Sequence, residues 1–211
     1  VDLMDAICKE MQANCELVAT AWDGIIPALT SKKIDIIFTS MSITDERKQV
    51  IDFSDKYYNT PAVIIGPKDQ KYGIKKSDLS GKIIGVQIST IHQNYVQKYF
   101  SEVVKELKSY QTQDEANADL AAGRLDAVMA DSIALQAFLK SESGQCCDVK
   151  GTLPNDVAIF GIGIGAGVRK EDQELKQRIN VAIKAVRDSG AYQEISDKYK
   201  TDFGDIDIFG Q

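Results

Sequence analysis

Arg47 and the residues just before it form the first candidate binding site in the sequence. Thr44 is placed to cap a short helix that begins at Asp45, and Arg47 lies in the first turn of that helix. The unpaired N–H groups of a helix N-terminus and the planar five-donor guanidinium both suit a carboxylate ligand. The alternative is that Arg47 pairs with Asp45 or with another surface acid, and the loop alone does not decide between the two.

Three further residues could contact a ligand. Asp131 lies at the exit of the otherwise apolar strand 125–130, where it could balance an ammonium group or cap the helix 132–140. Thr90 lies at another helix N-terminus, and by itself it indicates only a cap. Trp22 is the only tryptophan, and it could form a flat wall for a ligand or pack in the core.

The sequence contains few of the motifs that catalysis requires. Its single histidine, His92, has no serine or cysteine nucleophile motif around it. Gly-x-Ser-x-Gly, a Walker loop and His-Glu-x-x-His are all absent from the sequence. Glycines alternate with apolar residues along 160–167, which indicates a strand with close backbone approach rather than a dinucleotide loop. We therefore expect no catalytic residue, no cofactor and no metal site.

Charge and composition limit the possible partners. Among 211 residues, 25 Lys and Arg stand against 31 Asp and Glu, a net charge of −6. No basic stripe offsets this balance, so the counterion release that dominates nucleic-acid affinity is missing and we expect no nucleic-acid partner. No stretch reaches the roughly 18 consecutive apolar residues of a membrane helix. The length allows one or two domains, and 44 % hydrophobic residues are typical of a globular protein.

The four cysteines form two pairs along the chain. Cys8 ends the first predicted helix and Cys15 opens the apolar run 15–19, so a disulfide between them is geometrically easy and would imply an oxidising compartment. Two buried free thiols are the alternative. Cys146 and Cys147 are adjacent, and because neighbouring residues bridge only with a strained peptide unit we expect them to be free or separately buried. The spacing does not match a zinc site.

Strands and helices alternate along the chain, which predicts an α/β fold with a mostly parallel sheet. A capping box at Thr112–Glu115 and glycines after two helices support these elements. The expected strands are 15–19, 34–39, 83–87, 104–109, 125–130 and 159–168, and the expected helices are 1–12, 24–31, 45–50, 91–100, 113–122, 132–140, 171–188 and 191–199.

One pattern occurs twice in the sequence. The stretches 29–37 and 120–128 both indicate a helix end, a basic turn and a buried strand. Each strand then runs into polar residues, 39–42 in the first copy and 131–132 in the second. Two such units predict two lobes that face each other across a cleft, although helix-turn-strand units look alike in any α/β protein.

At this level of detail the sequence resembles a known family. The segments 22–29, 41–49 and 53–58, together with 122–127 and 167–170, are similar to the solute-binding proteins of polar amino-acid ABC transporters. The lysine/arginine/ornithine- and histidine-binding group matches best. The resemblance covers essentially the whole chain.

This resemblance implies the two-lobed type II periplasmic-binding-protein fold, in which each lobe is a mostly parallel sheet flanked by helices. Lobe 1 would comprise 1–60 and 164–211, and lobe 2 would comprise 61–163. Two hinge crossings are expected near 59–65 and 154–163. Family members begin with a strand and loop of about thirty residues ahead of the first helix, which contribute to the side-chain pocket and are absent from this sequence. Cys8 and Cys15 fall where the basic amino-acid binders have a disulfide.

The resemblance also assigns roles to residues of the candidate site. Arg47 would clamp the ligand α-carboxylate, helped by the Ser42 amide and by Thr90 of the other lobe. Asp131 would receive the α-ammonium group beside the Ser40 carbonyl, and Trp22 would stack on the ligand side chain. The full expected ligand-binding set is Trp22, Thr39, Ser40, Met41, Ser42, Arg47, Ser89, Thr90 and Asp131. The segment Ser89–His92 departs from the family pattern, which affects the carboxylate contact and selectivity.

The function implied is extracytoplasmic binding of a polar, cationic L-amino acid by cleft closure, for delivery to an inner-membrane ABC permease. We expect a periplasmic monomer whose partners are the free amino acid and the permease. Two alternatives use the same fold. A dehydratase of the cyclohexadienyl or arogenate type would need a general acid, for which His92 is the only histidine available. The other alternative is the sensing domain of a receptor.

Overall fold

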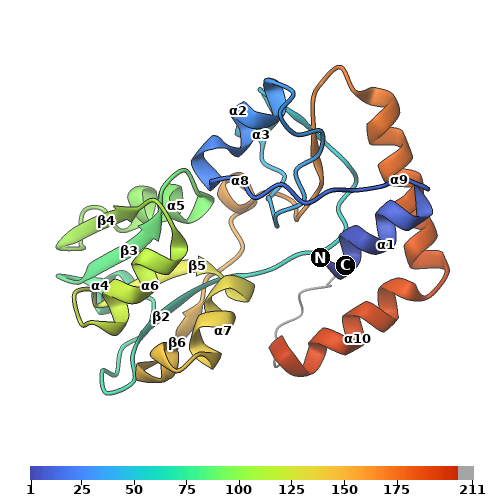
Figure 1. Ribbon diagram of the computed structural model, residues 1–211. Coiled ribbons are helices and arrows are strands. Elements are labelled where there is room, and N and C mark those ends of the chain that lie inside the picture. Colours follow the sequence, from blue (N-terminus) through green and yellow to red (C-terminus); the bar gives the residue numbers. More distant parts are fainter. Residues whose placement is uncertain (204–211) are drawn as a thin grey trace. The chain divides into compact units, whose positions relative to one another are not determined.

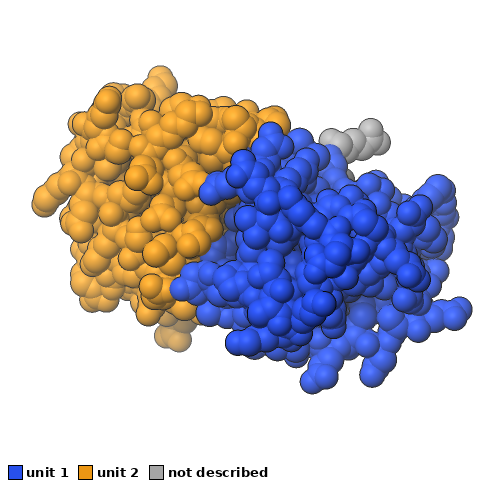
Figure 2. All heavy atoms as spheres, turned by 90° about the horizontal axis from the view of Figure 1, so that it is seen from above, with its two compact units in different colours: residues 1–59, 160–211 blue, residues 60–159 orange. Residues whose placement is uncertain are grey.

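The computed structural model describes residues 1–203, with side chains described as far as residue 198, so the end of the expected lobe 1 lies outside the described residues. The chain divides into two compact units (Figure 2): residues 1–59 with the described chain from Phe160 onward form unit 1, and Thr60–Ile159 form unit 2. The chain passes between them at 59–60 and at 159–160, which lie within the two expected crossings. The assignment of these units to two lobes that close on a ligand stays a prediction.

Unit 2 is built on a five-stranded sheet with strand order β4-β3-β5-β2-β6 (Figure 1). Strand β3 pairs in parallel with β4 and β5, whereas β2 pairs antiparallel with β5 and β6. The α/β class is confirmed, but the sheet is mixed rather than mostly parallel. The strands are β2 (Ala62–Pro67), β3 (Ile83–Gln87), β4 (Glu106–Tyr110), β5 (Ala127–Asp131) and β6 (Cys147–Thr152).

Strand β2 and strand β6 were not expected from the sequence. The start of β2 falls in the range taken for a hinge crossing, and its buried run 62–66 shows no alternation of polar and apolar residues. A strand at the interior of a sheet, covered on both faces, has no such alternation. Because β2 enters the sheet between β5 and β6, it supplies the antiparallel pairings that make the sheet mixed.

Helices cover the sheet of unit 2 (Figure 1). The capping box that opens α6 is present, with the Glu115 N–H donating to Thr112 Oγ1 and the Thr112 N–H donating to Glu115 Oε2, at 3.2 and 3.0 Å. Apolar side chains of α6 and α7, among them Leu120 and Leu135, join Val63 and Val128 of the sheet in one core cluster. The helices are α4 (Lys76–Leu79), α5 (Ile91–Tyr99), α6 (Gln113–Ala121), α7 (Ser132–Lys140) and the 3-10 turn η2 (Ser143–Cys146), and α8 (Val157–Phe160) lies at the second crossing.

Unit 1 contains mainly helices and short extended segments. Its regular strands, β1 (Asp52–Phe53) and β7 (Gly167–Val168), pair antiparallel. The longest helix is α9 (Gln173–Asp188), and no described helix in the protein is both long and apolar enough to cross a membrane. The other elements are α1 (Asp2–Glu10), the 3-10 turn η1 (Trp22–Gly24), α2 (Ile25–Thr30), α3 (Asp45–Lys48) and α10 (Ala191–Phe203).

Three expected strands of this unit are wrong in whole or in part. Residues 15–19 have no regular structure, and 34–39 contain only an isolated bridge between Ile37 and Gly167. The expected strand 159–168 begins in α8 and is regular only at β7. A run of apolar residues indicates that a segment is buried, but it does not show that the segment is a strand. A strand forms only where a neighbouring segment pairs with its backbone N–H and carbonyl groups over several residues.

The glycines between α8 and β7 allow the close backbone approach that their spacing predicted. A Cβ on Gly161 would lie 2.1 Å from the Ile43 carbonyl oxygen, and Gly161 has a φ of +76°. A Cβ on Gly165 would lie 2.8 Å from Ile43 Cδ1. The segment therefore packs directly on the loop that carries Ser42, and the Ile43 N–H donates to the Gly163 carbonyl at 2.8 Å.

Both cysteine pairs are disulfides. The Cys8–Cys15 bridge confirms the pairing that the family resemblance implies and ties α1 to the extended segment after it. Cys146 and Cys147 are also bonded to each other, so the expectation of free or separately buried thiols is wrong. This second bridge spans one peptide unit with Cα atoms 3.8 Å apart, the ordinary trans spacing, at the junction of η2 and β6.

Candidate functional site

Arg47 is held in place by the first turn of α3. The Thr44 hydroxyl accepts the Arg47 N–H at 3.2 Å, which confirms Thr44 as the N-cap, and the guanidinium donates from Nη1 to the Ser42 carbonyl at 3.0 Å. Burial lowers the pKa of Arg47 to about 10, against the opposing effect of Glu46. Asp45 lies 3.9 Å from Lys48 Nζ, so its ion pair is with that lysine. The guanidinium is thus a partly desolvated cation, which favours an anionic ligand.

Trp22 lies beside this arginine in unit 1. Its ring centroid is 5.4 Å from Arg47 Cζ, within the range of a cation–π contact. The ring is half-buried and packs against the core cluster that includes Ile25 and Leu29. The two interpretations of Trp22 are therefore compatible, because the core orients the ring and the ring lies against the guanidinium.

Two of the expected ligand residues have an uncommon backbone conformation. Among the described residues, the non-glycine positions with positive φ are Gln12, Lys32, Ser40 and Ser89. Gln12 and Lys32 directly follow the C-caps of α1 and α2, where a left-handed residue is common. Ser40 (φ 56°) and Ser89 (φ 60°) have no such explanation. Strained residues of this kind cluster at functional sites, and these two come from different units.

The residues around Ser40 differ in what they can offer to a ligand. Thr39 is exposed, whereas the Met41 side chain is 1 % exposed in the core, which leaves Met41 only its backbone. Ser42 forms an isolated antiparallel bridge with Ile164 through the Met41 carbonyl and the Ile43 N–H. Backbone groups alternate in direction along an extended chain, so the Ser42 N–H points away from that bridge. The Ser40 hydroxyl is hydrogen-bonded to the Tyr58 hydroxyl.

Asp131 ends β5 and caps α7 in unit 2. Its Oδ1 accepts the Ile133 N–H at 2.9 Å, which confirms the capping interpretation, and its Oδ2 accepts the Thr60 hydroxyl at 2.5 Å. Burial raises the pKa of Asp131, and these two hydrogen bonds oppose the rise. Each carboxylate oxygen retains a second lone pair, so capping does not prevent Asp131 from accepting an ammonium group.

Thr90 is the N-cap of α5, the second candidate of unit 2. Its Oγ1 accepts the Gln93 N–H at 3.2 Å and donates to the Gln87 carbonyl at 2.7 Å. The Ser89 N–H donates to Gln93 Oε1 at 2.9 Å, which holds the left-handed turn between β3 and α5. His92 follows in the first turn of this helix and is 8 % exposed. The expected site elements of unit 2 are therefore the start of α5 and the start of α7.

The expected residues divide between the two units. Unit 1 holds Trp22 and Arg47 in contact, with Arg47 also bonded to the Ser42 carbonyl. Unit 2 holds Asp131, Ser89 and Thr90 at two strand-to-helix junctions. Sequence reasoning missed Tyr58 and Thr60, whose hydroxyls contact Ser40 and Asp131. Their position beside the expected crossing was the only available signal. No group of three metal-ligating side chains occurs among the residues described.

Comparison with known proteins gives the same family over nearly the whole chain. A model of the bacterial extracellular solute-binding proteins, family 3, matches residues 1–202. The chain is 43 % identical to the L-arginine-binding protein of Pseudomonas aeruginosa and 36 % identical to the histidine-binding periplasmic protein of Salmonella typhimurium, in both cases over all of this chain and 80 % of the relative.

A solved structure is also similar. An ancestral arginine-binding protein bound to arginine superimposes with a TM-score of 0.84 at 34 % identity, covering 96 % of this chain and 86 % of that one. Sequence family, curated relatives and solved structure thus agree on the type II periplasmic-binding-protein fold. The protein belongs to the bacterial extracellular solute-binding proteins, family 3.

Proposed function

We propose that this protein binds a polar, cationic L-amino acid in the periplasm and delivers it to an ABC transporter permease. The observation that carries the proposal is the pair of half-buried, oppositely charged groups, Arg47 in unit 1 and Asp131 in unit 2. A free amino acid is a zwitterion, so it needs a cation for its carboxylate and an anion for its ammonium group. These two residues supply one of each.

Arg47 is suited to bind the carboxylate of the ligand. Its planar guanidinium offers parallel N–H donors that match two carboxylate oxygens, and the bond to the Ser42 carbonyl fixes its orientation. The Ser42 N–H and the start of α5 at Thr90 would add further donors. Asp131, anchored on both oxygens, would receive the ammonium group together with the Ser40 carbonyl.

The side chain of the ligand is expected to be cationic. Trp22 offers an aromatic face, which attracts a guanidinium or ammonium group as well as apolar atoms. Relatives at 36–43 % identity are named for binding arginine, histidine, or lysine, arginine and ornithine. We therefore favour arginine, lysine, ornithine or histidine.

Binding by groups from both units would couple ligand occupancy to hinge motion. A ligand that bridges two units stabilises the arrangement in which both contacts are made, which is the usual hinge closure around a ligand. We propose that units 1 and 2 are the two lobes and that the permease recognises their ligand-bound arrangement. A catalytic step has no part in this function, since the curated relatives are named as binding proteins and not as enzymes.

The proposal is tested by a thermal-shift screen with the twenty L-amino acids and ornithine, followed by calorimetric titration of every ligand that stabilises the protein. A ligand at about 100 Kd adds roughly 2.7 kcal/mol of stability, so a true ligand stands clear of the others. We expect a selective shift with one or more of the cationic amino acids. A folded protein that none of the amino acids stabilises would overturn the proposal.

A further inference from the structure

We propose that Tyr58 and Thr60, which flank Asn59 at the first crossing between the units, are positioning residues for the ammonium end of the ligand. The two hydroxyls contact Ser40 and Asp131, the two residues that would receive the ammonium group. This inference rests on the proposed function, and it adds two residues outside the expected ligand-binding set.

Thr60 reaches Asp131 because of the register of the sheet. Ala62 at the start of β2 lies opposite Asp131 at the end of β5, and the Ser132 N–H donates to the Pro61 carbonyl at 3.0 Å. The Thr60 hydroxyl then donates to Asp131 Oδ2 at 2.5 Å, while the Ile133 N–H occupies Oδ1. With one donor on each oxygen, the carboxylate cannot rotate freely, and its remaining lone pairs have fixed directions.

The same hydroxyl favours the ionised form of Asp131. Burial raises the pKa of this carboxyl, and the groups that oppose the rise are the Thr60 hydroxyl and the Ile133 amide, neither of which carries a charge. In the ligand-free protein, a desolvated carboxylate needs hydrogen bonds of this kind, because a charge removed from water without a partner raises the free energy of the folded state. Thr60 therefore serves both the orientation and the ionisation of the proposed ammonium acceptor.

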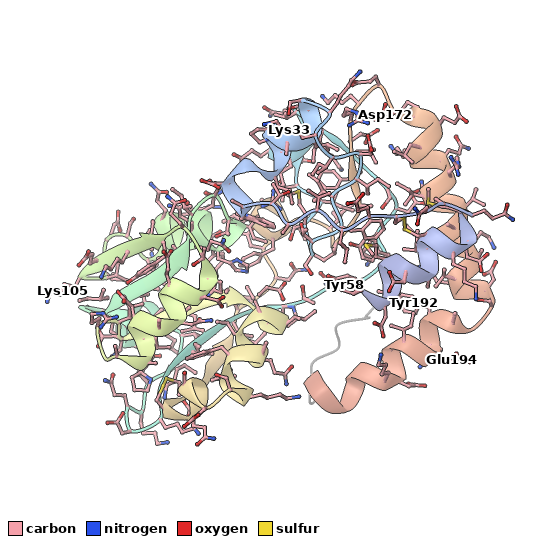
Figure 3. The ribbon with its side chains drawn as sticks, in the orientation of Figure 1. Lys33, Tyr58, Lys105, Asp172, Tyr192 and Glu194 are labelled. Atoms are coloured by element: carbon pink, nitrogen blue, oxygen red, sulfur yellow. A yellow bond between two sulfur atoms is a disulfide. The ribbon has the colours of Figure 1, made fainter. Side chains whose placement is uncertain are left out.

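Tyr58, labelled in Figure 3, has the corresponding role in unit 1. Its carbonyl accepts the Ile164 N–H at 2.9 Å, and its ring packs edge-on against Tyr57 with centroids 5.0 Å apart. These contacts hold the Tyr58 hydroxyl against the hydroxyl of Ser40, the residue with a φ of 56°. Since a left-handed serine persists only when its surroundings fix it, the Tyr58 contact helps to set the direction of the Ser40 carbonyl.

The covalent chain joins the two contacts. Tyr58, Asn59 and Thr60 are consecutive, and the boundary between the units falls between Asn59 and Thr60. A change of backbone angles at a crossing is how a hinge moves. Any such change therefore acts next to both acceptors of the ammonium group, which links hinge motion to the end of the ligand that carries the α-amine.

The test compares two ligands on matched variants. L-Arginine and 5-guanidinopentanoate share the guanidinium and the carboxylate, and the second lacks the α-amine. Thr60→Val keeps the shape of the side chain without its hydroxyl, and Thr60→Ser keeps the hydroxyl. We expect Thr60→Val to weaken L-arginine binding about 10-fold and to leave the analogue within about 2-fold, while Thr60→Ser retains the parent affinity for both. Tyr58→Phe should show the same selective loss for L-arginine.

Tyr99→Phe is the matched control, because the Tyr99 hydroxyl donates to Asp156 near the second crossing and contacts neither ammonium acceptor. It should leave both affinities unchanged. Equal losses for both ligands in Thr60→Val and Tyr58→Phe, or no loss at all, would overturn the inference. If Thr60→Val does not fold, Thr60→Ala provides the same comparison. A parent protein that binds no amino acid would instead refute the proposed function, so the two failures are distinguishable.

Discussion

The guanidinium carbon of Arg47 lies 5.4 Å from the centroid of the Trp22 ring. The two residues come from separate segments of unit 1, and the ring is fixed by its packing on the core around α2. Trp22 is also the only tryptophan of the protein. Its fluorescence therefore reports on the surroundings of Arg47 without interference from other tryptophans.

Replacing Arg47 should remove the anchor of the ligand carboxylate. We expect Arg47→Ala to weaken amino-acid binding about 100-fold, because truncating one partner of a buried charge pair costs several kcal/mol. Arg47→Lys should recover only part of this loss, since an ammonium group lacks the planar fork. Titration calorimetry measures both. Lys48→Ala is the control, because it removes a positive charge from the next position of α3. If Arg47→Ala binds as tightly as the parent, the proposed site is wrong.

Trp22 should contribute to the binding of cationic side chains. Trp22→Leu removes the aromatic face but keeps an apolar contact with the core, so we expect about a 10-fold loss of affinity for L-arginine. Trp22→Phe should lose less, because a smaller aromatic face remains. Calorimetry measures both variants, and in the parent the Trp22 fluorescence should change on addition of ligand. Unchanged affinity in Trp22→Leu would show that Trp22 only packs in the core.

Asp131 should reduce the stability of the ligand-free protein at neutral pH. Burial raises the pKa of Asp131 in the folded state, so the same carboxyl ionises at a lower pH in the unfolded chain. The favourable contribution of this group to the free energy of unfolding is therefore present at low pH and is lost as the pH rises through the folded pKa. Asp131→Asn does not ionise and can still cap α7. We expect Asp131→Asn to raise the melting temperature by about 1–4 °C at pH 7 while it abolishes tight amino-acid binding.

The pH dependence provides the check on this interpretation. The gain in melting temperature should shrink as the pH falls through the raised pKa of Asp131 toward the ordinary value of 3.8, because the parent carboxyl then becomes neutral as well. Calorimetric scans of both proteins across that range measure the difference. A gain that does not depend on pH would have to come from a change other than the removal of charge.

The Cys8–Cys15 disulfide should stabilise unit 1 through the loop that it closes. The cysteines are 7 positions apart. Closing a loop of this length lowers the conformational entropy of the unfolded chain, which stabilises the folded protein by about 2–3 kcal/mol. We expect the double variant Cys8→Ser, Cys15→Ser to melt about 5–10 °C lower than the parent. The melting temperature of the double variant Cys146→Ser, Cys147→Ser provides the comparison for the bridge in unit 2. Equal melting of parent and the first variant would contradict the prediction.

The sequence predicted the helices more reliably than the strands. Capping residues such as Thr90 and Thr112 act within a few positions, so the start of α5 and of α6 could be read locally. The same holds for the glycine that follows α6, Gly123, with its φ of +70°. Strand pairing depends on segments far apart in the chain. The antiparallel place of β2 and the absence of a ladder at 34–39 could not be read from local patterns.

The site divides in the same way. Charge and capping position indicated Arg47, Asp131 and Thr90, and the family resemblance added the neighbouring serines. Family membership confirms the predicted periplasmic location and the non-enzymatic role. The contact between Thr60 and Asp131 depends on a strand register that spans 71 residues, so no local pattern reveals it. The left-handed conformation of Ser40 likewise has no signature in the residue type.

The division of unit 1 into two chain segments has a consequence for folding. Ile37 bridges Gly167, and Ser42 bridges Ile164, so this unit is completed only after all of unit 2 has been synthesised. Unit 2 is one continuous stretch of chain, so all of its strands and helices are available before the second segment of unit 1 has been synthesised. We expect unit 2 to form first, while residues 1–59 remain without the segment that begins at Phe160. Residues 1–59 are then the part most exposed to proteases and chaperones during export.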